Sequence, residues 1–282
     1  MLITFIGGGN MASALISGLA NPPRSDLSLR VVDPSDEARQ RLEATFELTA
    51  YTDPVAAIDG ADVVLLAVKP QTMPQVLAQL RGHVTEDQLV LSIAAGITID
   101  SIRQALGGGS SVVRCMPNTP ALIGHGITGM TASRDCSERQ RGRAERIMAA
   151  ASEVVWLDDE KLMDAVTAVS GTGPAYYFLL TEALARAARE LGLPPATADR
   201  LAAITCFGAG AMMATSPDEA EELRRRVTSP GGTTEAAMAV LEGGGFRDLM
   251  SRAVAAAEAR SRELSGQAGD TTNGAADGAT NE

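Results

Sequence analysis

A glycine-rich segment near the amino terminus has the spacing of a dinucleotide-binding loop. Gly7, Gly9 and Ala12 form the pattern G-x-G-x-x-A between an apolar run and an amphipathic stretch. The first glycine allows a tight turn, the second lets the backbone approach a pyrophosphate, and the small third residue lets the helix pack on the strand. Free N–H groups at the helix start then bind the phosphates. The predicted cofactor contacts of this loop are Ile6, Gly7, Gly8, Gly9, Asn10, Met11 and Ala12.

The end of the second predicted strand bears on which dinucleotide is bound. Asp33 lies where an acid bonds the adenosine ribose 2′-hydroxyl, which favours NAD because a carboxylate repels a 2′-phosphate. Ser35 follows closely, and Arg39 and Arg41 are near enough to clamp a 2′-phosphate, although both arginines fit a solvated helix face equally well. Asp33 and Ser35 are predicted cofactor contacts, and the choice between NAD and NADP stays open.

Three further strand ends supply candidate cofactor contacts, because ligands of open α/β sheets bind at the carboxyl edge. These residues are Ala67, Val68, Lys69 and Pro70 after one strand, Ala94, Ala95 and Gly96 after the next, and Asn118 after a third. Lys69 fits a phosphate or ribose contact, or a solvated turn. Asn118 fits a ligand contact or a cap of its own turn.

A second glycine loop, Ser229-Pro-Gly-Gly232, precedes a predicted helix that starts near Thr233. Free N–H groups and the helix dipole suit a small carboxylate there, and the glycines permit close approach and positive φ. Helix capping alone explains one hydroxyl, but not two threonines directly behind Gly-Gly. The predicted substrate contacts are Ser229, Gly231, Gly232, Thr233 and Thr234.

The first glycine loop requires strands and helices that alternate, and the sequence supplies them as far as residue 159. The candidate strands are Leu2–Ile6, Leu29–Val32, Asp62–Val68, Leu89–Ile93, Val112–Cys115 and Val154–Leu157. The candidate helices are Asn10–Ala20, Asp36–Thr45, Met73–Leu80, Ile99–Leu106 and Glu138–Ala151. This alternation predicts an α/β Rossmann domain over residues 1–159, with a doubly wound, mostly parallel sheet.

The character changes near Glu160, and residues 160–264 are predicted to form an all-α domain. Its helices are apolar on more than one face, and Leu201–Met213 carries no charge. A helix that is apolar all round must be buried, and about 100 residues offer limited interior for it. We therefore expect this domain to complete its core against another subunit, and we expect residues 265–282, small and polar, to form a disordered tail.

Composition excludes several classes of function. The chain has 282 residues, 45% of them hydrophobic, and a net charge of −11, which argues against a nucleic-acid partner. No apolar run approaches the roughly 20 residues that span a bilayer, and the amino terminus lacks the features of a signal peptide. Three widely spaced cysteines and two histidines offer neither a disulfide framework nor a metal site. We expect a cytoplasmic protein with no membrane partner.

Six motifs occur in the order GGGNMA, AVKP, SIAAGIT, MPNTP, AVSGTGPAYYF and SPGGTT. From Ile3 to Leu264 the chain resembles the pyrroline-5-carboxylate reductase family. The resemblance implies a Rossmann domain followed by a helical domain that interlocks with its twin in a dimer, often within a larger ring such as a pentamer of dimers. It also implies NAD(P)H-dependent hydride transfer to C5 of 1-pyrroline-5-carboxylate, which gives L-proline in the last step of proline biosynthesis.

The resemblance also assigns residue roles. Thr234 matches the catalytic-site threonine whose hydroxyl reaches the ring nitrogen, and Glu160 matches a position at the substrate pocket, although it also fits a surface acid in a first helical turn. Ser170 and Gly171 would form a bend beside the nicotinamide, or a plain helix kink. No strong general acid is evident, and an imine protonated in solution needs none.

Two rival classes of protein remain. A β-hydroxyacid dehydrogenase or imine reductase carries a catalytic Lys or Asp on its inter-domain helix, whereas here no lysine follows Lys161 in that region and the SPGGTT loop is foreign to those enzymes. A non-enzymatic dinucleotide sensor would have no reason to keep a second anion-binding loop.

Overall fold

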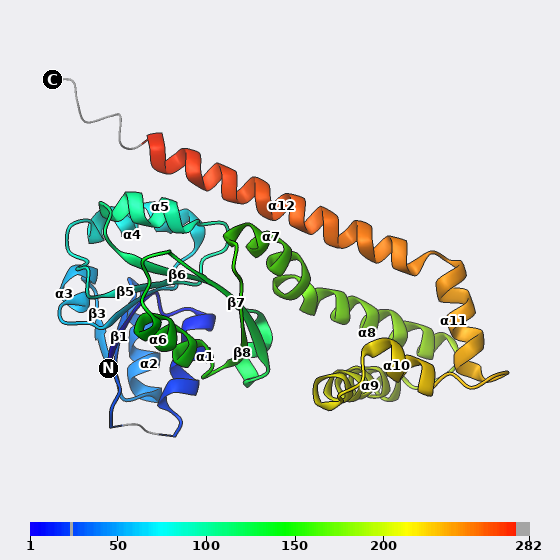
Figure 1. The fold of residues 1–282 in the computed structure, drawn as a ribbon. Helices are drawn as coiled ribbons and strands as arrows, with labels where there is room; N and C mark the ends of the chain where they lie inside the picture. The colour runs from blue at the N-terminus through cyan, green and yellow to red at the C-terminus, as the bar shows by residue number, and fades with distance from the viewer. Residues whose placement is uncertain (23–24, 275–282) are drawn as a thin grey trace. The chain divides into compact units, whose positions relative to one another are not determined.

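The computed structural model describes residues 1–22 and 25–274 (Figure 1). The chain forms two compact units. Unit 1 comprises Met1–Gly171 together with the chain from Ala257 onward, and unit 2 comprises Thr172–Ala256. The chain thus leaves unit 1 once and returns to it.

Unit 1 is built on one sheet of eight described strands. They are β1 (Leu2–Ile6), β2 (Ser28–Val32), β3 (Thr49–Tyr51), β4 (Val63–Leu66), β5 (Leu89–Ser92), β6 (Ser111–Met116), β7 (Gly126–Ala132) and β8 (Ser152–Trp156). Their order is β3-β2-β1-β4-β5-β6-β7-β8. All neighbours are parallel except β6 and β7. The predicted doubly wound, mostly parallel sheet is confirmed.

Helices cover both faces of this sheet (Figure 1). They are α1 (Asn10–Ala20), α2 (Asp36–Thr45), α3 (Pro54–Ile58), α4 (Met73–Leu80), α5 (Ile99–Leu106), α6 (Glu138–Met148) and α7 (Met163–Val166). In β4, Val63 and Leu65 join one buried core with α1 and α6, while Val64 and Leu66 join the other with α4 and α5. Alternate residues of a strand point to opposite faces, so a strand covered on both faces is apolar throughout.

The sequence did not predict β3, α3 or β7, and the helix expected to reach Ala151 ends at Met148. β7 reads GITGMTA, with no continuous apolar run. Gly129 within it has a specific role, because a Cβ there would lie 2.7 Å from Val166 Cγ1 of α7. The glycine lets α7 approach the strand closely, as glycines inside strands often do.

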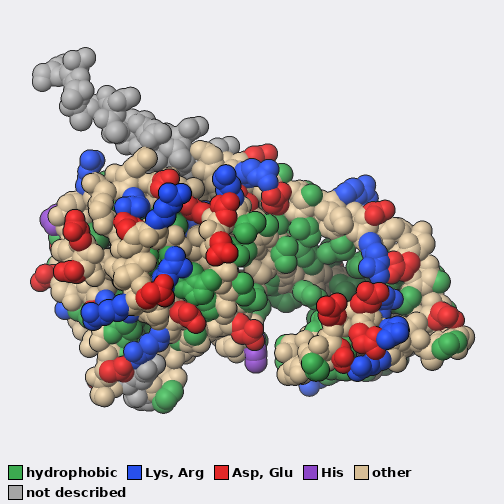
Figure 2. Space-filling model, viewed as in Figure 1, with side chains coloured by type: hydrophobic (Ala, Val, Ile, Leu, Met, Phe, Trp, Pro, Cys, Tyr) green, Lys and Arg blue, Asp and Glu red, His purple; other side chains and the backbone are tan. Residues whose placement is uncertain are grey.

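Unit 2 is helical in its described residues. It contains α8 (Gly173–Glu190), α9 (Pro195–Thr215), α10 (Ala220–Arg226), α11 (Thr233–Gly243) and the start of α12 (Phe246–Gly274). Large apolar side chains lie exposed on it, and Figure 2 shows hydrophobic side chains gathered where α8 runs. The exposed residues include Tyr177, Phe178, Leu179 and Leu180 on α8, Leu201 and Phe207 on α9, and Val240 on α11. The face that these helices expose is one that a monomeric protein would ordinarily bury.

The predicted tail differs from the structure in its first part, because α12 continues to Gly274. Extending an existing helix adds a hydrogen bond per residue without a new nucleation cost, so small polar residues can follow a long helix. Residues 275–282 of that prediction lie outside the described residues. Within the described ranges, none of the helices combines the length and apolar character that crossing a bilayer requires.

Candidate functional site

The dinucleotide loop joins β1 to α1 and is tightly packed at Gly7. Gly7 N donates to Val32 O of β2 at 2.7 Å, and its φ is +108°. A Cβ at Gly7 would lie 2.7 Å from Ala67 O, a backbone atom that follows β4. Both the φ angle and the carbonyl require glycine here.

The start of α1 presents backbone donors. Gly9 is the N-cap, no described side chain caps the helix, and its first turn has no acidic residue. A Cβ built on Gly9 meets no atom within 4 Å, so the backbone is open to close approach on that side. Free N–H groups at the start of an 11-residue helix, beside an accessible glycine, fit a dinucleotide pyrophosphate. The residues present therefore suit the cofactor that the sequence predicts.

Five adjacent parallel strands bring the predicted cofactor residues to one edge of the sheet. In the order β2, β1, β4, β5 and β6, their carboxyl ends lead to Asp33, Gly7, Ala67–Pro70, Ala94–Gly96 and Asn118. Lys69 is exposed and is the N-cap of the short 3₁₀ helix η1 (Pro70–Thr72). The carboxyl edge is where open α/β sheets bind ligands, so the placement agrees with the predicted site.

Asp33 ties the dinucleotide loop to the segment after β2. Its Oδ2 accepts from Gly8 N at 2.8 Å, and its Oδ1 accepts from Ser35 N at 2.9 Å. The Ser35 hydroxyl caps α2 by accepting from Ala38 N at 3.2 Å. The carboxylate therefore has a fixed position beside the loop.

Asn118 follows β6 and uses both ends of its amide within the protein. Its Nδ2 donates to Ser170 O at 3.1 Å, and its Oδ1 accepts from Ile127 N of β7 at 3.0 Å. Ser170 belongs to a π-helical turn, η4 (Thr167–Gly171), where the sequence suggested a bend or kink. Neither bond caps the turn that follows Asn118, because no described side chain caps the 3₁₀ helix η2 (Thr119–Ile123). The amide instead links η4 to β7.

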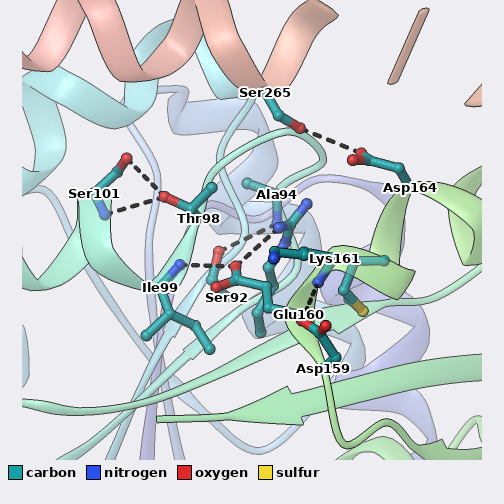
Figure 3. A network of polar contacts seen from close by, with 12 residues as sticks. Ser92, Ala94, Thr98, Ile99, Ser101, Asp159, Glu160, Lys161, Asp164 and Ser265 are labelled. Carbon is teal, nitrogen blue, oxygen red and sulfur yellow. Dashed lines mark hydrogen bonds and ion pairs between the residues drawn. The ribbon is translucent and has the colours of Figure 1, made fainter. Parts of the chain in front are cut away.

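Glu160 begins the 3₁₀ helix η3 (Glu160–Leu162), and its Oε1 accepts two bonds. The donors are Arg114 Nη1 of β6 and, as Figure 3 shows, Ile99 N, the first N–H of α5, each at 2.9 Å. The Arg114 side chain is only 5% exposed. One carboxylate oxygen thus joins a strand, a helix start and the segment that leads out of unit 1.

Sequence reasoning missed Arg114, although a signal was present. The strand reads SVVRCM, so a charged residue interrupts a buried apolar run. A buried charge requires a partner, and that requirement alone predicts an acid nearby in space. The partner, 46 residues away along the chain, cannot be identified from local pattern.

A second missed contact attaches α12 to unit 1. Asp164 Oδ1 accepts from Ser261 Oγ at 2.7 Å, and it also accepts from Ser265 Oγ at 3.4 Å, a contact that Figure 3 shows. A Cβ on Gly96 would lie 3.5 Å from the Leu264 carbonyl carbon. The helix therefore lies directly over the Ala94–Gly96 loop, one of the predicted cofactor contacts.

The second glycine loop lies between α10 and α11 of unit 2. Gly231 has a φ of +70° and donates its N–H to Glu235 Oε2 at 2.7 Å, and Gly232 N donates to Ser229 O at 3.0 Å. Gly232 is the N-cap of α11, which begins at Thr233 as predicted, and no described side chain caps it. Thr234, half-buried, follows in the first turn. The loop places the Thr233 N–H at the start of an 11-residue helix, where a carboxylate can bind, while the N–H groups of Gly231 and Gly232 are bonded within the chain.

The cysteines do not contribute chemistry to this edge. Burial raises the pKa of the Cys115 thiol, so it stays protonated and unreactive. Among the residues that the structure describes, no group of three or more His, Cys, Asp or Glu could hold a metal ion.

Comparison with known proteins finds relatives of both parts of the chain. Residues 2–96 match the family model described as NADP oxidoreductase, coenzyme F420-dependent, and residues 160–264 match the pyrroline-5-carboxylate reductase dimerisation model. A pyrroline-5-carboxylate reductase of Pseudomonas aeruginosa is 46% identical, over 95% of this chain and 98% of that protein.

Solved structures show the same fold along nearly the whole chain. A pyrroline-5-carboxylate reductase from Coxiella burnetii matches with a TM-score of 0.89 and 40% identity, covering 93% of this chain and 98% of that one. Pyrroline carboxylate reductase from Plasmodium falciparum, with NADP bound, has a TM-score of 0.81 and 28% identity, covering 94% and 98%. On this similarity, the chain belongs to the pyrroline-5-carboxylate reductase family.

Proposed function

We propose that this chain reduces 1-pyrroline-5-carboxylate to L-proline with a nicotinamide dinucleotide, as the last step of proline biosynthesis. The observation that carries the proposal is the Ser229–Thr234 loop at the start of α11. The same chain also brings the predicted dinucleotide contacts together at the carboxyl edge of the unit 1 sheet. A loop that can bind a carboxylate suits the acid group of this substrate. The carboxyl edge of the sheet suits the nicotinamide dinucleotide that reduces it.

Unit 1 holds the cofactor in this proposal. The N–H groups at the start of α1 bind its pyrophosphate, Asp33 and Ser35 lie at its adenosine ribose, and the strand ends at Ala67–Pro70 and Ala94–Gly96 line its course. When bound, the dihydronicotinamide supplies a hydride to the imine carbon C5. The protein contributes orientation and the exclusion of water.

Unit 2 holds the substrate acid. The backbone N–H of Thr233 binds the carboxylate, and those of Gly231 and Gly232 join it once they exchange their bonds to Glu235 Oε2 and Ser229 O for the substrate. Ser229 adds a hydroxyl or backbone contact, and the Thr234 hydroxyl orients the ring nitrogen. The imine nitrogen takes its proton from solvent before reduction, so Thr234 acts by hydrogen bonding and not as a strong acid. Electron balance is complete once C5 accepts the hydride and the iminium becomes the amine of proline.

Glu160 is proposed to contact the substrate and also to hold neighbouring elements of unit 1 together. Its Oε1 already bonds Arg114 and Ile99 N, so only Oε2 is proposed to face the substrate, directly or through water. Asn118 is proposed to shape the cofactor edge through the bonds that hold η4. Both residues therefore position the site as well as line it.

A spectrophotometric assay tests the function. We expect the purified protein to oxidise NADH or NADPH with 1-pyrroline-5-carboxylate and to leave a β-keto acid, the substrate of a hydroxyacid dehydrogenase run in reverse, unreduced. An assay with a larger cyclic imine separates the imine-reductase alternative. If the protein binds the dinucleotide but reduces none of these three substrates, the result favours a non-enzymatic dinucleotide sensor and contradicts the proposal.

We also propose that residues 160–264 form the dimerisation domain of a cytoplasmic homo-oligomer, a dimer or a pentamer of dimers. The matched dimerisation model and the exposed apolar face of α8 support this. Phe178, 68% exposed, should lie in the interface, and Phe178→Glu should raise the dissociation constant about 30-fold or more in sedimentation experiments. The control is Ile123→Glu, 73% exposed on unit 1, which should leave assembly unchanged.

A further inference from the structure

We infer that this chain binds NADH in preference to NADPH and that Asp33 determines the preference. The inference rests on one part of the proposed function, namely that the loop at Gly7 binds a nicotinamide dinucleotide. Sequence alone left the choice open, because an acid, a serine and two arginines lie within one short segment. The hydrogen bonds of that segment now separate their roles.

Asp33 is an anion held in place beside the cofactor loop. It follows β2, whose Val32 pairs with Ile6 of β1, and its two oxygens accept from Gly8 N and Ser35 N. A carboxylate has about four acceptor positions on its two oxygens, so two backbone bonds leave capacity for more. Ribose hydroxyls are neutral donors and can fill it. A 2′-phosphate is an acceptor with a charge of the same sign, and it meets repulsion instead.

The two arginines are already bonded to protein groups. Arg39 Nη1 donates to Asp33 O at 2.5 Å, its Nη2 forms an ion pair with Asp36, and its side chain is only 15% exposed. Arg41 Nη2 donates to Gly8 O at 3.3 Å. Arg39 would have to give up its contacts to clamp a phosphate, and Arg41 would have to leave the loop carbonyl.

The remaining groups of the segment do not favour a phosphate either. The Ser35 hydroxyl serves as the cap of α2, and the Asp36 carboxylate is paired with Arg39. A phosphate at this turn would meet the Asp33 carboxylate, while both arginines are engaged elsewhere. The family fold itself does not exclude NADP, since the Plasmodium falciparum relative has it bound, so residues such as Asp33 must decide the preference.

Dissociation constants measured without substrate test the inference. Titration of the wild-type protein, followed by the fluorescence of the reduced nicotinamide, should give a constant at least tenfold lower for NADH than for NADPH. Asp33→Asn keeps the size and one acceptor of the side chain but removes the charge, and it should reduce this ratio at least fivefold. Equal constants, or tighter NADPH binding by the wild type, would overturn the inference.

A matched control separates Asp33 from general acidity. Glu37→Gln removes the same charge from the exposed side of α2 and should change the ratio less than twofold. If Glu37→Gln changed the ratio as much as Asp33→Asn, the preference would come from the overall negative charge around the start of α2. That result would contradict the specific role of Asp33. Should Asp33→Asn not fold, titration of the wild type in rising salt replaces it, because screening weakens repulsion and the ratio should fall.

Kinetics distinguish the two proposals. If kcat/KM with 1-pyrroline-5-carboxylate follows the binding preference for NADH, both stand. If both dinucleotides bind with the expected ratio but the imine is not reduced, the proposed function fails and the inference stands. If the imine is reduced with NADPH preferred, the inference alone fails.

Discussion

The chain contains two glycine loops that each lead into a helix of 11 residues, and they are built differently. The loop at Gly7 is held between β2 and β4, with a backbone carbonyl 2.7 Å from where a Cβ would be. The loop at Gly231 is exposed, and a Cβ on Gly231 meets no atom within 4 Å. Both present backbone N–H groups, but the sheet supports only the first.

The difference follows from the units that contain the loops. Unit 1 buries two apolar cores against a sheet covered on both faces, so its loop has rigid neighbours from within the unit. Unit 2 exposes large apolar side chains on α8 and α9. The loop at Gly7 therefore has support within a single chain, whereas the loop at Gly231 belongs to a unit whose apolar helix faces lie exposed.

The largest expected effect is a loss of stability when the Arg114–Glu160 ion pair of unit 1 is broken. Arg114→Met leaves the part-buried Glu160 carboxylate without its charged partner and should cost about 3 kcal/mol of unfolding free energy, the low end for a buried pair, because Glu160 is 28% exposed. The double variant Arg114→Met, Glu160→Met should recover most of that loss, because neither charge remains buried. Chemical denaturation of the three proteins measures it, and a double variant no more stable than Arg114→Met would show that the pair is not the cause.

Alanine at the two loop glycines compares them directly. Gly7→Ala introduces both a strained φ and a contact with Ala67 O, for an expected loss of about 2–4 kcal/mol. Gly231→Ala introduces strain alone, about 1–2 kcal/mol. Thermal unfolding of both variants gives the ranking. Equal losses would mean that the packing difference between the loops has no energetic consequence.

Thr234 tests the chemistry of the exposed loop. Thr234→Ala should lower kcat/KM roughly ten- to a thousandfold through the loss of one or two oriented hydrogen bonds, with little change in the melting temperature. Thr233→Ala, which keeps the backbone N–H, serves as the neighbouring control and should lose much less. Unchanged kinetics in Thr234→Ala would remove the threonine from the mechanism.

The smallest effect concerns Asp62, which braces the sheet of unit 1. Partial burial alone would raise its pKa, but the bond from Leu2 N and the charge of Arg143 outweigh it, and the pKa is lowered from 3.8. A lowered folded-state pKa contributes stability above the unfolded value, and this is lost as pH falls through the folded value. The stability difference between wild type and Asp62→Asn, below about 1 kcal/mol for a part-exposed pair, should therefore shrink below about pH 4. A constant difference would contradict the assignment.

Local signals predicted much of this structure. The bounds of α1, α2, α4 and α5 agree with the sequence, because caps such as Ser35 and Thr98 and the left-handed Gly107 mark helix ends. β7 was missed because its glycines serve close packing, which leaves no apolar run. The pairs Arg114–Glu160 and Asp164–Ser261 join residues 46 and 97 apart and leave no local trace. Roles that depend on ligands, such as that of Thr234, stay predictions.

The return of α12 to unit 1 has a consequence for synthesis on the ribosome. Residues 257–265, which cover Gly96 and bond Asp164, are made only after all of unit 2 has been made. The sheet can assemble early from the first 156 residues, but the loop at Gly96 gains its helical cover last. A nascent or prematurely terminated chain would accordingly display a formed nucleotide fold in which the loop after β5 is still uncovered.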